Sequence, residues 1–215
     1  MNILLILEGY EEETFFEIAK ENGFASNLNV IFGNACGSGN VAPYFQSEIS
    51  NEYYDCILCV YDVDNKINDS ESPYNCIRSS LKKILLDDDK IDDISICTNP
   101  NILQFFLLAA DKLQNVKIMS TSKTTNTNVI NKYWPEIGKN KKLYDASEWQ
   151  RKLLKDKIVY GPYSFDTLLK NAEELDFDYK QKNPASNLLP LLKALKCGDE
   201  NYFQKAILVK EVEEW

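Results

Sequence analysis

Ile57-Leu58-Cys59-Val60-Tyr61-Asp62-Val63-Asp64 is an apolar and aromatic run that leads directly into two acids. A run of this kind, bounded by polar residues, is typical of a strand buried on both faces of a parallel sheet. Asp62 and Asp64 then lie at the carboxyl end of that strand, where open α/β sheets bind their ligands. Alternate residues of an extended segment point the same way, so we expect both carboxylates to face one site. A divalent cation between them would relieve their mutual repulsion.

The chain on either side of this strand alternates between strand and helix patterns. Apolar strands are expected at 2–7, 28–32, 55–61 and 94–97, with a further one at 116–119. Helices are expected between them. The first follows the strand 2–7 and ends near Asn22, and the others cover 41–51, 72–86 and 101–113. This order predicts an α/β fold with a mainly parallel sheet of four to five strands, flanked by helices and joined by right-handed crossovers.

The second half of the chain has a different character. Helical spacing of apolar residues recurs at 123–133, 146–157, 164–175, 185–196 and 200–213. We therefore predict an α/β core at 1–120 and a helical C-terminal annex at 121–215 that packs on the core. Two polar segments of the first half, the glycine-containing 34–40 and the acidic 87–89, are expected to be loops.

Composition restricts the function classes. The 215 residues carry a formal net charge of −9, which argues against a surface that coats DNA, although a local basic patch or a bound metal can still serve a nucleic-acid enzyme. No apolar run approaches the length of about 20 residues that a membrane span needs. Six cysteines without a secretory signal indicate reduced thiols in a cytoplasmic protein. Histidine is absent, which excludes Ser-His-Asp and Cys-His catalysis and leaves carboxylate–metal or Lys/Tyr chemistry.

A third acid follows the first strand. Glu8 comes directly after the apolar segment 2–7, and the first and third strands of a doubly wound sheet are commonly neighbours. Glu8 would then lie beside Asp62 and Asp64. Three carboxylates at one sheet edge form an oxygen site suited to Mg²⁺ or Mn²⁺ and not to zinc. Gly9, next in the chain, would let the backbone approach a ligand closely.

These residues resemble a known family. Glu8-Gly9 after a first strand, with Asp62-Val63-Asp64 after a later one, is similar to the Toprim signature of topoisomerases, primases and OLD-type nucleases. The closer resemblance is to the RloB-like proteins, a Toprim-related group associated with bacterial defence and restriction. Its V-E-G-x-x-T-E motif is similar to the segment 7–12, its Ser-Asn-Pro segment is similar to Thr98-Asn99-Pro100, and 183–187 also looks like a family element.

The resemblance implies roles for individual residues. Glu12 matches the second acid of the motif, with one residue fewer between, which implies a metal site of Glu8, Glu12, Asp62 and Asp64. Thr98 and Asn99 are either phosphate-positioning residues or a helix-start signal. Leu103 stands where the family carries a glutamate. That departure implies either a weaker metal site or an inactive relative.

Three functions therefore remain open. The resemblance implies a Mg²⁺-dependent nuclease that hydrolyses phosphodiesters of DNA or RNA, with Asp62 and Asp64 holding the metal and Glu8 acting as acid–base or additional ligand. The second is a catalytically degenerate Toprim-like component that binds or regulates together with a protein partner of a defence system. The third is another carboxylate-based phosphotransfer enzyme, such as a haloacid-dehalogenase-like phosphatase, although Asn65-Lys66 after the acids departs from that pattern.

Overall fold

The structure of this chain is a computed structural model, which describes residues 1–64, 66–99, 102, 165–173 and 185–206. Its centre is a sheet of strands β1 (Asn2–Leu7), β2 (Asn29–Asn34), β3 (Cys56–Asp62), β4 (Ser95–Asn99) and β5 (Ala185–Ser186). The strands are arranged in the order β2-β1-β3-β4-β5. The first four are parallel, and the short β5 pairs antiparallel with β4. The predicted α/β class and mainly parallel sheet are confirmed.

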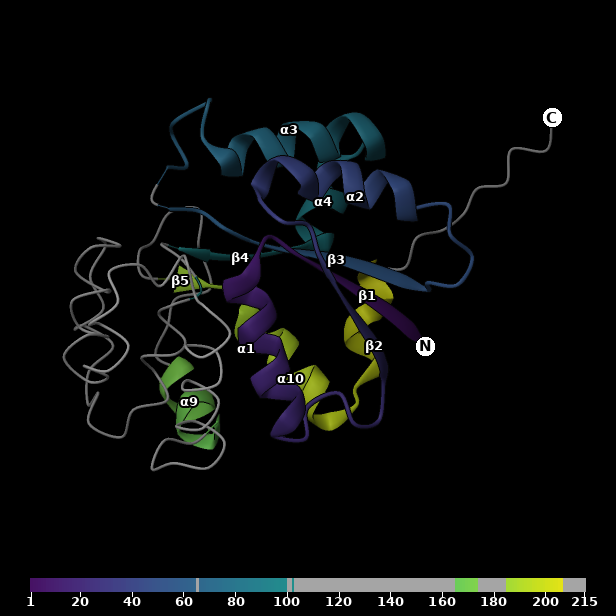
Figure 1. Ribbon diagram of the computed structural model, residues 1–215, viewed down its shortest axis with the longest axis vertical. Helices are drawn as coiled ribbons and strands as arrows, with labels where there is room; N and C mark the ends of the chain where they lie inside the picture. The colour runs from purple at the N-terminus through teal and green to yellow at the C-terminus, as the bar shows by residue number, and fades with distance from the viewer. Residues whose placement is uncertain (65, 100–101, 103–164, 174–184, 207–215) are drawn as a thin grey trace.

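Helices cover both faces of the sheet (Figure 1). The helices α2 (Val41–Glu48), α3 (Pro73–Leu85) and α4 (Asp88–Ile94) lie on one face, and α1 (Tyr10–Glu21) and α10 (Leu188–Cys197) lie on the other. The remaining described elements are α9 (Phe165–Ala172) and the 3-10 segments η1 (Ser38–Asn40) and η4 (Glu200–Ala206). Coverage on both sides explains why the central strands are apolar throughout, because each side chain meets a helix whichever way it points.

The core forms where α1 packs against the sheet. Residues 3–7 of β1 and 56–61 of β3 are all buried. Phe15 and Phe16 pack edge to face at 5.5 Å, and Phe15 also lies 5.6 Å from Phe165 of α9. The helix α1 ends at Glu21, and Gly23, two residues later, has a φ of 84° that is accessible to glycine at low cost. The end of this helix, expected near Asn22, is confirmed.

Two segments differ from the sequence prediction. Asp87 does not lie in an acidic loop, because its carboxylate accepts from the N–H groups of Asp89 and Lys90 and begins α4. Acids in that first turn also suit the helix dipole. Ala185-Ser186 is a strand and not the first turn of a helix, and α10 starts only at Leu188. Residues 185–186 therefore belong to the sheet, and the division of the chain at residue 120 stays a prediction.

The other expected helices of the second half, at 123–133 and 146–157, lie outside the described residues, as do the strand expected at 116–119 and most of the helix expected at 101–113. The helix expected at 164–175 is found as α9. The segment 200–206 is the 3-10 segment η4 and not the start of an α-helix.

Ser72 fixes the loop that follows β3, and its replacement provides a first test of the fold. This residue is buried, its Oγ accepts from the N–H of Asn75 at 3.2 Å, and it is the N-cap of α3. We expect Ser72→Ala to lower the free energy of unfolding by about 1 kcal/mol, measured by urea denaturation. Ser79→Ala, on an exposed part of the same helix, is the control. Equal midpoints for the two variants would show that the cap does not hold this loop.

Candidate metal-binding site at the carboxyl edge of the sheet

The end of β1 lies directly beside the end of β3. Leu7 is in register with Val60, and the N–H of Glu8 donates to the carbonyl oxygen of Val60 at 3.0 Å. The Glu8 side chain then turns toward β3, where its Oε2 accepts from the N–H of Asp62 at 2.9 Å. The predicted adjacency of the first and third strands is confirmed, and it places residues 54 positions apart in one hydrogen bond.

Asp62 is held by the segment that follows β4 as well. Its Oδ1 accepts from the N–H of Ile102 at 2.9 Å, and the N–H of the next residue, Val63, donates to the carbonyl oxygen of Thr98 at 2.9 Å. The strand ends at Asp62, and Asp64 adopts a left-handed conformation with φ 53°. The alternation rule of an extended strand therefore does not reach Asp64, although both acids still line the same pocket.

The first turn of α1 supplies further carboxylates. Glu12 is only 4% exposed, and its Oε2 accepts from the N–H of Gly9, the N-cap residue, at 2.9 Å. Gly9 has an extended backbone that any residue can adopt, and a Cβ there would meet the Glu12 carboxylate at an ordinary 3.7 Å. Neither the backbone conformation nor the surrounding space therefore requires a glycine at this position, and the close approach of a ligand to Gly9 stays a prediction.

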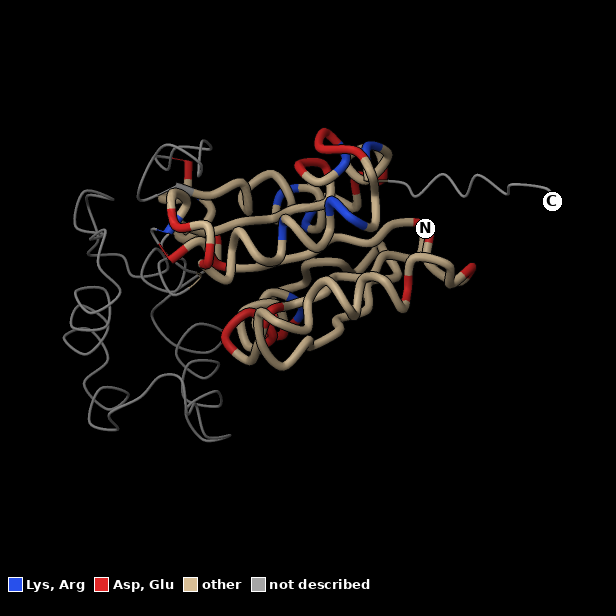
Figure 2. Tube along the Cα trace, turned by 90° about the horizontal axis from the view of Figure 1, so that it is seen from above, with Lys and Arg blue, Asp and Glu red and all other residues tan. Residues whose placement is uncertain are grey.

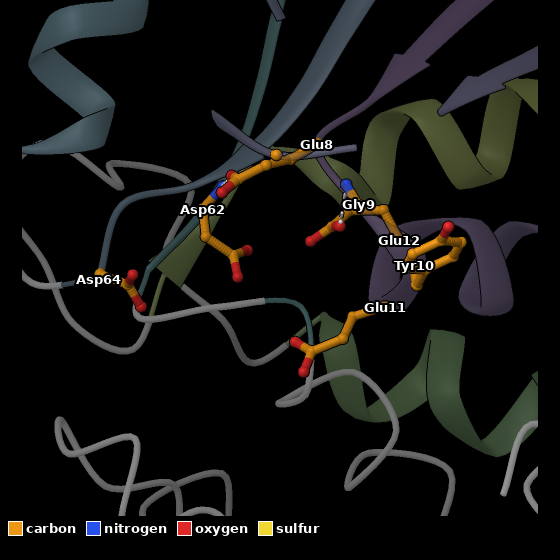
Figure 3. Close-up of a pocket in the computed structure, with 8 residues that line it drawn as sticks. Glu8, Gly9, Tyr10, Glu11, Glu12, Asp62 and Asp64 are labelled. Carbon is orange, nitrogen blue, oxygen red and sulfur yellow. Dashed lines mark hydrogen bonds between the residues drawn. The ribbon is translucent and has the colours of Figure 1, made fainter. Parts of the chain in front are cut away.

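These side chains share one pocket of about 200 Å³. It is lined by five acids, namely Glu8, Glu11, Glu12, Asp62 and Asp64. Figure 3 shows four carboxylates directed toward a common space, those of Asp62 and Asp64 from the end of β3 and the turn after it, and those of Glu11 and Glu12 from the first turn of α1. No lysine or arginine is among the described lining residues. In Figure 2 a group of acidic segments lies at this end of the molecule, opposite the N-terminus.

Burial and mutual repulsion shift the proton affinities of this pocket. Desolvation, together with the charges of Glu8 and Glu11, raises the pKa of Glu12 from 4.5 to about 8. Desolvation also raises the pKa of Asp62 well above its ordinary value, with added repulsion from Glu12 and Glu8. Carboxyls in this state release their protons readily when a cation neutralises the pocket.

Three lining residues were not among the predicted site residues. Glu11 comes from the first turn of α1, where acids are usually explained by the helix dipole alone. Tyr10 lies at the pocket margin and is 51% exposed. Gly37 belongs to the glycine-containing segment predicted to be a plain loop, and its N–H donates to the carbonyl oxygen of Glu8 at 2.7 Å. Tyr10 and Glu11 fall on unspecified positions of the motif at 7–12, and Gly37 lies in no motif, so the sequence pattern does not single out any of the three.

Thr98 and Asn99 take a different place from the other candidates. Both are buried in β4, with exposures of 1% and 3%, and neither lines the pocket. The Oγ1 of Thr98 lies 3.2 Å from the Oγ of Ser186, on the side of the C-terminal segment. Both residues therefore belong to the strand between Asp62 and the segment 185–186, and not to the pocket. Leu103 lies outside the described residues.

The pocket acids lie close together but are not arranged as a complete set of metal ligands among the described residues. Across the described ranges, no group of three or more Cys, Asp or Glu side chains is arranged to hold a metal ion. The five pocket acids therefore do not form an all-protein cage in this conformation. A Mg²⁺ ion does not require one, because it commonly keeps several waters and binds through one or two carboxylates together with substrate phosphates.

Each helix among the described residues is too short or too polar to span a lipid bilayer. The chain matches no protein-family model, no curated protein and no solved structure.

Proposed function

We propose that this chain is a divalent-metal-dependent phosphodiesterase that hydrolyses nucleic acid. The observation that carries the proposal is the 2.9 Å hydrogen bond from the backbone N–H of Asp62 to the Glu8 carboxylate, in a pocket that three further acids also line. An acidic pocket repels phosphate unless a cation neutralises it, and an oxygen-only donor set fits Mg²⁺ or Mn²⁺. A bound ion would neutralise charge on the phosphate and lower the pKa of its water ligands.

The residues of the chain would divide the work in a simple way. Glu8 and Asp62, which are joined by the hydrogen bond from the Asp62 N–H to the Glu8 carboxylate, are the pair that would hold the ion, with Asp64 and Glu12 as further oxygen donors. Backbone N–H groups orient both members of the pair, because Asp62 donates to Glu8 and Ile102 donates to Asp62. Glu12, with its raised pKa, can hold a proton near neutral pH and exchange it with a reacting group.

A second function has one observation in its favour. Since no three acids among the described residues are arranged around a metal, the pocket also suits a catalytically degenerate component that acts with a protein partner. A role in bacterial defence, in either form, follows from the resemblance to RloB-like proteins. The two functions differ in one measurable property, which is whether the purified chain cleaves nucleic acid alone.

Metal binding is the first experiment. We expect Mn²⁺ and Mg²⁺ to raise the melting temperature at pH 7.5, by an amount that grows with the logarithm of metal concentration above the dissociation constant. Glu8→Gln should remove most of this stabilisation, because glutamine keeps an oxygen for the Asp62 N–H but loses the charge. Glu13→Gln is the matched control, since Glu13 lies five residues further along the chain in the first turn of α1, does not line the pocket and accepts a hydrogen bond from the side chain of Asn34. Stabilisation that is equal in all three proteins would contradict the proposed site.

Cleavage assays on three kinds of substrate decide the substrate class. With Mn²⁺, the wild-type chain is expected to nick supercoiled plasmid or to cleave labelled RNA, and to leave a phosphomonoester intact. Phosphate release from the monoester alone would favour a phosphatase. Metal binding without cleavage of any substrate would favour the degenerate component.

A further inference from the structure

The free edge of β4 is covered by a short segment from the far end of the chain. Ala185 pairs with Asn99 and Ser186 pairs with Thr98, both antiparallel. Asn187 continues along the same edge with its side chain, whose Oδ1 accepts from the N–H of Cys97 at 2.7 Å and whose Nδ2 donates to the carbonyl oxygen of Ser95 at 2.8 Å. The amide of Asn187 thus takes the hydrogen bonds that a neighbouring strand would make.

Ser186 adds a second set of bonds at the same place. Its Oγ donates to the carbonyl oxygen of Cys97 at 2.9 Å and accepts from the N–H of Leu188 at 3.0 Å. The residue is 1% exposed, and burial of a hydroxyl is costly unless it is hydrogen-bonded. Asn187 is the N-cap of α10, yet its side chain makes no cap bond to that helix. Its amide is committed to β4 instead.

The opposite edge of β4 holds the candidate metal-binding pair in place. Thr98 is in register with Asp62, and its carbonyl oxygen accepts from the N–H of Val63. Beyond β4, the N–H of Ile102 donates to the Asp62 carboxylate. We call residues 62–64, where the chain leaves β3, the Asp62 turn. The end of β4 is therefore bound by residues 185–187 on one side and by the Asp62 turn on the other.

We propose that Ser186 and Asn187 are positioning residues, which fix the Asp62 carboxylate by holding the end of β4. We call residues 185–187 the C-terminal clamp. Its effect on metal binding rests on the proposed function, whereas its effect on the Asp62 turn does not. Without the clamp, the β4 backbone at Ser95 and Cys97 loses its partners on that edge. A less rigid β4 then no longer fixes the Thr98 carbonyl oxygen that Val63 contacts, or the position of the Ile102 N–H.

The test compares two asparagines that each make two side-chain hydrogen bonds at opposite ends of the sheet. Asn187→Ser removes the two bonds to β4. Asn2→Ser is the control, because Asn2 donates to the carbonyl oxygen of Tyr53 and accepts from the Nδ2 of Asn29 near the amino ends of the strands. Asn187→Ser is expected to lose more thermal stability than Asn2→Ser, because its bonds to β4 are partly buried and those of Asn2 are exposed. The protection of the β1 amides therefore separates a local effect from a general loss of stability.

Hydrogen exchange in metal-free buffer gives the deciding readout. We expect Asn187→Ser to speed exchange of the Val63 and Ile102 N–H groups by about tenfold or more relative to Asn2→Ser, while the amides of β1 stay protected. Faster exchange at Cys97 alone, with Val63 and Ile102 unchanged, would overturn the proposal, because the clamp would then act only on its own contacts.

Mn²⁺ affinity, followed by the electron paramagnetic resonance of the free ion, gives the functional readout. Asn187→Ser is expected to weaken binding roughly tenfold, as loss of residues that orient metal ligands does elsewhere, and Asn2→Ser to leave it unchanged. Equal affinity in both variants overturns the link between clamp and site. Absence of Mn²⁺ binding in the wild-type chain refutes the metal site itself, and the exchange measurement still decides whether the clamp fixes the Asp62 turn.

Discussion

Replacement of Asp62 by asparagine is expected to lower nucleic-acid cleavage by about 10³-fold or more while leaving the metal-free protein at least as stable as the wild type. The first effect follows because a metal-bound carboxylate contributes several kcal/mol to a phosphoryl-transfer transition state, and about 4 kcal/mol corresponds to that factor. The second follows from the environment of Asp62, where desolvation and the charges of Glu12 and Glu8 disfavour the ionised form. Asparagine keeps an oxygen for the Ile102 N–H and removes the repelled charge.

The opposite signs of these two effects make the prediction specific. A residue that served only the fold would lose activity and stability together. Asp55→Asn is the matched control, because Asp55 immediately precedes β3 at its other end and its Oδ2 accepts a backbone N–H from Asn2 at 2.7 Å. Steady-state cleavage and thermal melts of the three proteins are the measurements. A large fall in the melting temperature of Asp62→Asn would identify Asp62 as a structural residue and remove the main support for the metal site.

The parallel core and the pairing of its first and third strands could be predicted because local pattern and topology agree there. The apolar run that leads into Asp62 has no polar face, which only a doubly covered strand allows. Once β1 and β3 are neighbours, Glu8 and Asp62 must meet, since parallel strands end at the same edge. That part of the site required no knowledge of side-chain conformation.

The remainder of the site depends on contacts that no local pattern encodes. Ser186 and Asn187 lie in a stretch with helical periodicity, and their strand-like role arises only from pairing with β4, 88 positions or more earlier in the chain. The left-handed turn at Asp64 places that acid by backbone geometry and not by strand alternation. Glu12 was matched by resemblance to a motif, but its burial follows from the packing of the first turn of α1 beside the pocket.

Glu12 leads to the second prediction, that the wild-type protein loses stability as pH rises through neutrality. The pKa of Glu12 is raised from 4.5 to about 8 in the folded chain. Between these values the folded state keeps a proton that the unfolded state has released. The free energy of unfolding therefore falls with rising pH, by up to about 1.4 kcal/mol per pH unit for each such group. The raised pKa of Asp62 acts in the same direction.

Glu12→Gln isolates this contribution. Glutamine retains a side-chain oxygen for the N–H of Gly9 but cannot ionise, so the variant should be more stable than the wild type at pH 7.5 and above. We expect a gain of at least about 1 kcal/mol, or roughly 2–4 °C in melting temperature, and a shallower fall of stability between pH 5 and about 8. Glu17→Gln, on the exposed side of the same helix, is the control for the loss of one negative charge. Urea denaturation across this pH range is the measurement.

Metal links the pH dependence to function. A divalent cation in the pocket favours ionised carboxylates, so Mg²⁺ should restore much of the stability that the wild type loses above neutrality. Glu12→Gln should gain less from Mg²⁺, because one of the repelling charges is already absent. The wild type would then be least stable at high pH without metal and most responsive to metal under those same conditions. If Glu12→Gln melted below the wild type at pH 8 without metal, the buried carboxylate would be a net stabilising group and the charge-repulsion account of this pocket would be wrong.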